Sequence, residues 1–236
     1  MSFYSILAVA HVALGVLALL TFWTAGMAKK GSPLHRGAGK VYLAAMAGLL
    51  LLAVPMALTI LRVRGVVAGS FLLYLVVITT TSVWLAWRAI RDKRDWRRYT
   101  GPVYRGLAWA NLGGGLGIAA VGLLLAQQMQ LVIVSFSAIG LLTFVRMRRF
   151  ARSAPDEPRW WLREHLRAML GNGVATHIAF LAIGLPRLVP ALANPVWVNV
   201  AWLAPLLLAL VAGVLLQRKF LPVRTPAARA AALPAA

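Results

Sequence analysis

The fold is decided by apolar runs such as GKVYLAAMAGLLLLAVPMALTIL at residues 39–61, in which Lys40 is the only charged side chain. A helix of about 20 mostly apolar residues crosses the roughly 30 Å hydrocarbon core of a bilayer. Seven such runs lie along the chain, at residues 3–27, 39–61, 66–90, 104–126, 129–147, 164–186 and 196–217. We interpret each as a helix, because unpaired backbone groups are costly in lipid and the runs lack the alternation of barrel strands.

The composition supports a membrane protein. The 236 residues are 61% hydrophobic with a mean hydropathy of +0.79, which lies outside the range of soluble domains. The absence of cysteine excludes disulfides, zinc-thiolate sites, iron–sulfur clusters and a thiol nucleophile. The sequence therefore predicts an all-α integral membrane bundle of seven helices over residues 1–222, followed by a disordered tail at 223–236 that is rich in alanine and proline.

The basic residues indicate how the bundle is oriented. Of the 25 lysines and arginines, 22 fall beside the first, third and fifth connections or after the last span, and only Arg62, Arg64 and Arg187 fall on the other side. The positive-inside rule then places the N-terminus outside and the C-terminus in the cytoplasm. The net charge of +20 is explained by anionic lipid headgroups without nucleic acid. We expect a multi-pass protein of the bacterial inner membrane.

The four histidines of the chain fall into two tiers in this topology. At 1.5 Å per helical residue, His11 lies about 12 Å and His177 about 14 Å below the outer surface. His35 precedes the second span and His165 opens the sixth, so both lie near the cytoplasmic surface. The tiers are about 18 Å apart along the sixth span, but His165 and His177 point about 120° apart around it and need separate partners.

Neighbouring residues suggest that each pair could hold a haem. Gly15 and Gly173 lie four residues from His11 and His177, so each glycine shares the helix face of its histidine and offers a flat surface to a porphyrin. Four basic residues beside the lower pair could bind haem propionates through charge-assisted hydrogen bonds. They are Arg36, Lys40, Arg163 and Arg167.

The acidic residues narrow the alternatives. All five lie in or beside the predicted cytoplasmic loops. This argues against the hypotheses of a proton-coupled carrier and of a site for hard cations. The five acids are Asp92, Asp95, Asp156, Glu157 and Glu164. The histidines could also serve only in hydrogen bonds between helices or as solvated interfacial residues.

Three blocks resemble a known family. HVALGVLALL at 11–20, KGSPLHRGAGKVYLAAM at 30–46 and REHLRAMLGNGVATHIAFLAIGLPR at 163–187 are similar to a group of bacterial multi-pass predicted membrane proteins of unknown function. The matching positions are His11, His35, Arg36, Gly39, Tyr42, His165 and Met169. A looser architectural likeness links the histidine pairs to cytochrome b561 and similar di-haem membrane cytochromes, whose ligands come from within central helices.

These observations lead to a functional hypothesis with two alternatives. We expect a haem b protein that transfers electrons across or within the membrane, with His11 and His177 as the upper ligand pair and His35 and His165 as the lower. A quinone or a redox partner protein would exchange the electrons. The first alternative is a carrier or assembly factor whose histidine-lined cavity binds a copper or zinc ion. The second is a structural membrane subunit.

Overall fold

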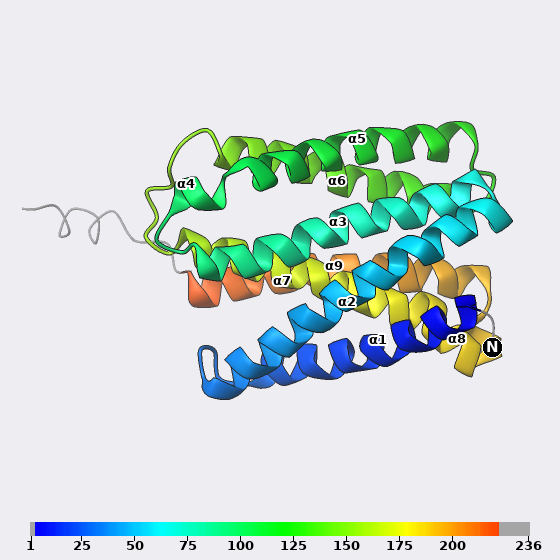
Figure 1. Ribbon diagram of the computed structural model, residues 1–236, viewed down its shortest axis with the longest axis horizontal. Coiled ribbons are helices and arrows are strands. Elements are labelled where there is room, and N and C mark those ends of the chain that lie inside the picture. The colour runs from blue at the N-terminus through cyan, green and yellow to red at the C-terminus, as the bar shows by residue number, and fades with distance from the viewer. Residues whose placement is uncertain (1–2, 222–236) are drawn as a thin grey trace, which may run out of the picture.

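The computed structural model describes residues 3–221, and all regular structure in this range is helical (Figure 1). The elements are α1 (Phe3–Met27), α2 (Pro33–Arg64), α3 (Val66–Arg91), α4 (Trp96–Tyr99), α5 (Pro102–Leu124), α6 (Gln130–Phe150), α7 (Trp160–Ile178), the π-helix η1 (Ala179–Gly184), α8 (Leu185–Leu188), the 3₁₀-helix η2 (Pro190–Leu192) and α9 (Pro195–Phe220). Seven helical segments are long and apolar enough to span a membrane, which confirms the predicted spans. The tail predicted at 223–236 lies outside the described residues.

The helices run back and forth, so their connections gather at two ends (Figure 1). The α1–α2 loop, α4, the α6–α7 connection and the end of α9 lie at one end, on the left of the figure. We call this the basic end, because these connections and the adjoining helix turns carry most of the lysines and arginines. The start of α1, the α2–α3 turn and α8 lie at the opposite end, together with Arg62, Arg64 and Arg187.

Helix α2 begins six residues before the predicted span. Ser32 is its N-cap, and the Ser32 hydroxyl accepts a hydrogen bond of 3.2 Å from the backbone N–H of His35. Pro33 follows at the first helical position, where the missing N–H of proline has no cost. His35 therefore lies in the first turn of α2, which corrects the expectation that it precedes its span.

The sixth span is continuous but changes its winding after His177. The backbone N–H of Leu185 bonds to the carbonyl of Phe180, five residues earlier, so η1 is wound as a π-helix. Pro186 has no N–H, and in an α-helix its ring would meet the carbonyl of Ala182. A wider turn before Pro186 relieves this conflict. The span as a whole runs over Trp160–Leu188.

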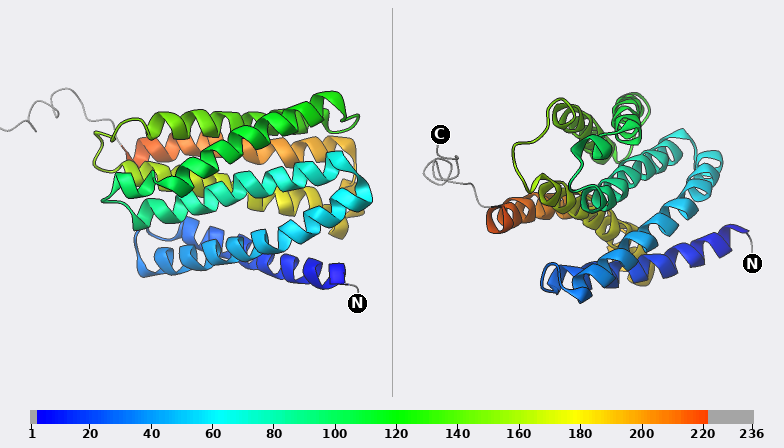
Figure 2. Two further views of the ribbon diagram at one scale, coloured as in Figure 1. Left: turned by 45° about the horizontal axis from the view of Figure 1, so that its top comes forward. Right: turned by 60° about the vertical axis from the view of Figure 1, so that its left-hand side comes forward.

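Helices α3 and α7 form the centre of the bundle. They pack on each other, while α3 also contacts α2 and α5, and α7 also contacts α1 and α9. Figure 2 shows the α1–α2 and α5–α6 hairpins on opposite sides of this central pair. Side chains that face inward from α2 and α7 are therefore enclosed by α1 and α3.

Candidate functional site

His177 uses both of its ring nitrogens within the protein. Nε2 accepts a hydrogen bond of 3.1 Å from the indole Nε1 of Trp23, and Nδ1 lies 2.7 Å from the carbonyl oxygen of Gly173. An indole N–H only donates and a carbonyl only accepts, so His177 is the neutral tautomer with its hydrogen on Nδ1. No lone pair of His177 is free to bind a metal in this arrangement.

His11 and His177 have different neighbours. Trp23, the partner of His177, lies 12 residues after His11 in α1, about 18 Å further along the helix. The His11 ring lies against the backbone of Leu49 in α2, and its Nδ1 is buried without a hydrogen-bond partner among the described residues. The structure therefore does not bring the upper pair together, which corrects the prediction that these two imidazoles converge.

The glycines of the upper tier differ from each other. Phe22 covers Gly173, because a Cβ placed there would lie 2.5 Å from the Cζ atom of that ring. The Phe22 and His177 rings also meet edge to face, with centroids 5.5 Å apart. Gly15 has nothing within 4 Å of its Cβ position. The predicted flat surface beneath the upper pair is thus filled on the α7 side.

The lower pair has the geometry of oriented metal ligands. Nδ1 of His35 lies 2.9 Å from the carbonyl oxygen of Ala25 in α1, and Nδ1 of His165 lies 2.9 Å from that of Ala86 in α3. Each Nδ1 must carry the hydrogen, which leaves the lone pair on Nε2. Metal-binding histidines are oriented in this way. His35 and His165 are also close enough to interact electrostatically.

Lys30 supports the anchor of His35. Its ammonium donates a hydrogen bond of 3.1 Å to the same carbonyl of Ala25, near the C-terminus of α1, where a positive charge is favourable. Partial burial lowers the pKa of Lys30, and the nearby charge of Lys219 lowers it further. The carbonyl of Ala25 therefore holds both a cation and the imidazole of His35.

Two matching stripes connect the lower pair to the interior of the bundle. His35, Gly39, Tyr42 and Met46 on α2 repeat the spacing of His165, Met169, Asn172 and Thr176 on α7, and both sets fall on one helix face. We call these eight residues the α2–α7 site. Because α2 and α7 both begin at the basic end, the two stripes run in the same direction.

Direct contacts join the stripes above the histidines. The hydroxyl of Tyr42 lies 2.9 Å from that of Thr176, and the Thr176 hydroxyl lies 3.5 Å from the sulfur of Met46. Met169 packs against the same cluster of α2 residues. The site is therefore closed toward the opposite end by the Tyr42–Thr176 pair.

The middle of the site contains an unusual polar group. Asn172 is fully buried, and neither its amide nitrogen nor its amide oxygen has a hydrogen-bond partner among the described residues. On α7 it lies between His165 and Thr176, one helical turn before Thr176. A buried amide without partners costs about 1–3 kcal/mol.

The predicted propionate-binding residues divide into two groups. Arg163 forms an ion pair with Glu157, and Arg167 lies 3.2 Å from a carboxylate oxygen of Glu164. Arg36 and Lys40, by contrast, are exposed on the first turns of α2. Arg36 and Lys40 are therefore the two predicted residues that are both exposed and close to His35 in sequence.

Two of the hydrogen bonds described above could not be predicted from the sequence. Trp23 resembles an ordinary aromatic residue at a membrane interface, and Tyr42 carries no signal of its hydrogen bond to Thr176. The repeated spacing of four, seven and eleven residues from each histidine was the available clue, because such positions share a helix face.

The fold is that of a multi-pass membrane protein with seven candidate spans, and the α2–α7 site lies between two of them. Comparisons with protein-family models, with curated proteins and with solved structures found no match to the chain. The resemblance of the three sequence blocks therefore stays an expectation, and function has to be argued from the α2–α7 site.

Replacing Asn172 with leucine is expected to stabilise the ligand-free protein by about 1–3 kcal/mol, because the variant no longer buries an unpaired amide. Thermal or denaturant unfolding in detergent would measure this change. Asn111→Leu is the matched control, since Asn111 donates to the Thr81 hydroxyl at 2.7 Å and to a backbone carbonyl, and its loss should destabilise. A less stable Asn172 variant would contradict the unpaired state.

Proposed function

We propose that the protein is a haem b protein of the bacterial inner membrane, with His35 and His165 as axial ligands. The observation that carries the proposal is the pair of imidazoles on α2 and α7, each fixed by an Nδ1 hydrogen bond to a backbone carbonyl with Nε2 left as the ligand atom. A haem bound there would supply reversible one-electron transfer. The upper pair is not part of the proposal, because the ring nitrogens of His177 are occupied.

The number of ligands favours haem over a bare ion. No group of three or more histidine, aspartate or glutamate side chains suited to a metal ion occurs among residues 3–221. A zinc ion takes three or four protein ligands. Haem iron receives four nitrogens from the porphyrin, so two axial imidazoles complete its coordination.

The surrounding residues have defined tasks in this proposal. The carbonyls of Ala25 and Ala86 fix the orientation of the imidazoles and make them better electron donors to iron. Gly39, one turn after His35, leaves space beside the ligand. Arg36 and Lys40 provide cations for propionates at the basic end.

Orientation and partners follow from the charge distribution. The positive-inside rule supports a cytoplasmic basic end, an outer N-terminus and a cytoplasmic C-terminus. The α2–α7 site would then lie on the cytoplasmic side of the bilayer. A quinone in the lipid or a redox protein at the cytoplasmic surface would exchange electrons with it.

An absorption spectrum tests the proposal directly. Protein purified from haem-replete cells should show a Soret band that sharpens on reduction with dithionite, with about one haem per chain because one bis-imidazole pair is available. Protein without haem and without bound metal would contradict the proposal and favour a structural membrane subunit.

A metal-ion site is a second candidate, favoured by the thioether of Met169, which lies one helical turn after His165. Thioether and imidazole ligands together suit a soft ion such as Cu(I). Elemental analysis distinguishes the candidates, because colourless protein with stoichiometric copper or zinc would support the ion and exclude haem.

A further inference from the structure

A small cavity at the basic end lies outside the α2–α7 site. It has a volume of about 280 Å³ and lies between the last turns of α3, the short helix α4 and the start of α5. It is lined by Trp84, Pro102 and Val103 and by the arginines Arg88, Arg97 and Arg98. Its lining thus combines apolar and cationic side chains.

Two of the three arginines are fixed in place. Buried Asp92 forms ion pairs with Arg88 and with Arg98, the latter at 3.5 Å. Arg88 also donates a hydrogen bond of 3.2 Å to the carbonyl of Arg98, and its guanidinium lies 5.1 Å from the ring centroid of Trp84. A single carboxylate therefore orders two cations, and Arg97 adds an exposed third.

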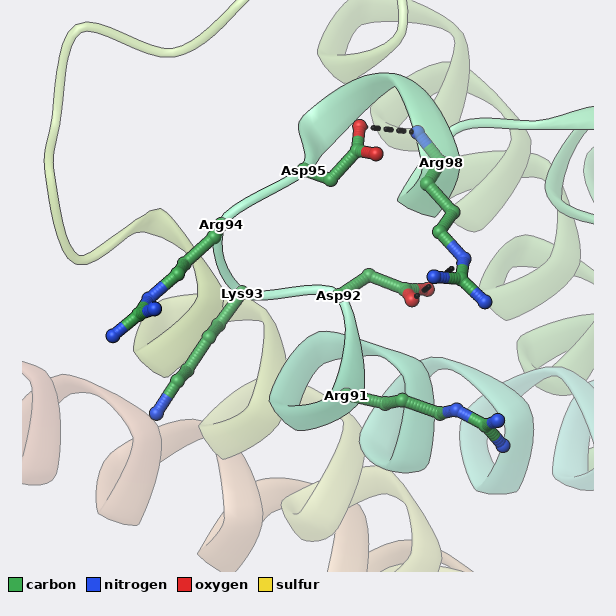
Figure 3. Close-up of a pocket in the computed structure, with 6 residues that line it drawn as sticks. All are labelled: Arg91, Asp92, Lys93, Arg94, Asp95 and Arg98. Carbon is green, nitrogen blue, oxygen red and sulfur yellow. Dashed lines mark hydrogen bonds and ion pairs between the residues drawn. The ribbon is translucent and has the colours of Figure 1, made fainter.

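A larger hollow of about 460 Å³ also has Arg98 in its lining, and it combines the basic residues Arg91, Lys93 and Arg94 with two acids (Figure 3). The carboxylates of Asp92 and Asp95 line it, and Asp95 accepts a hydrogen bond of 2.9 Å from the backbone N–H of Arg98. Lys93 and Arg94 extend away from these acids in Figure 3. An anion would meet two carboxylates there as well as the cations, whereas no carboxylate lines the smaller cavity, which is therefore the better anion site.

We infer that the smaller cavity binds an anionic phospholipid, with the headgroup phosphate on Arg88, Arg97 and Arg98 and the start of an acyl chain along Trp84 and Val103. The three arginines match a phosphate, which arginine binds through paired N–H groups. The apolar part of the lining adjoins the apolar spans of α3 and α5, where lipid chains would lie. Basic pockets between helices at the cytoplasmic surface bind anionic lipids in this way.

The test measures phosphatidylglycerol binding to the full-length protein in detergent, by titration with thermal unfolding or native mass spectrometry as readout. Arg97→Gln should weaken phosphatidylglycerol binding about fivefold, the effect of one interfacial cation. Val103→Trp should weaken binding by filling the cavity. Phosphatidylcholine should bind more weakly than phosphatidylglycerol to the unmodified protein.

Arg94→Gln is the matched control, because Arg94 is exposed on the same loop but extends away from Arg98. This variant should bind phosphatidylglycerol normally. Equal losses for the Arg94 and Arg97 variants would overturn the proposal in favour of diffuse surface attraction. Inorganic phosphate that binds as tightly as phosphatidylglycerol would overturn it in favour of a free-anion site.

Discussion

Replacing either His35 or His165 with alanine is expected to weaken haem binding by at least about 100-fold. Losing only a group that hydrogen-bonds to a ligand costs up to about 100-fold, and losing the ligand itself should cost more. Each variant removes one of two axial ligands while the other imidazole keeps its backbone anchor. Soret absorbance per mole of protein and extracted haem content would measure the loss. Circular dichroism would show that the helices remain.

Free imidazole provides a second readout for these variants. Deleting a histidine side chain leaves room for an imidazole molecule, so millimolar imidazole should restore the spectrum of a six-coordinate haem in either alanine variant. A variant that had lost haem through misfolding would not recover in this way. Recovery therefore separates ligation from a structural role of the same residue.

His177→Gln is the control for both substitutions. His177 bonds to Trp23 and to the carbonyl of Gly173, and glutamine can replace one of these bonds. We expect an unchanged haem content and a stability loss of about 1 kcal/mol. Haem lost from this variant but retained in the His35 and His165 variants would place the cofactor at the upper tier instead.

The spans could be predicted because lipid imposes a single strong constraint on each of them. A run of about 20 apolar residues must be helical whatever it packs against. The ends were less certain, since they depend on caps. Ser32 and Pro33 extend α2 to include His35, and Pro186 turns the end of the sixth span into a π-helix.

The histidine tiers could be predicted only in part, because depth along a helix is not position in a bundle. Helices tilt, and a side chain can reach a residue at another level. His177 therefore bonds to Trp23 near the end of α1 rather than meeting His11. The anchors of His35 and His165 are backbone carbonyls, which every residue has, so no sequence pattern marks them.

The second substitution for which we expect a large effect is at Glu164. This acid lies at the basic end and is buried, with an exposed fraction of 2%. Its two carboxylate oxygens lie 2.8 Å from Arg146 and 3.2 Å from Arg167, so one acid joins α6 to α7. Glu164→Gln is expected to destabilise the protein by about 1–3 kcal/mol, because it removes a buried carboxylate from its bonds to two guanidinium groups that are each about one-third exposed. Denaturant unfolding in detergent would measure this loss.

Glu157→Gln is the matched control, since Glu157 pairs with Arg163 and both side chains are more exposed than Glu164. Exposed ion pairs contribute about 0–1 kcal/mol, so this variant should unfold almost like the original protein. Equal losses for the two variants would contradict the role of burial. Adding Arg146→Leu to Glu164→Gln should restore part of the stability, because it removes a guanidinium that has lost its carboxylate partner.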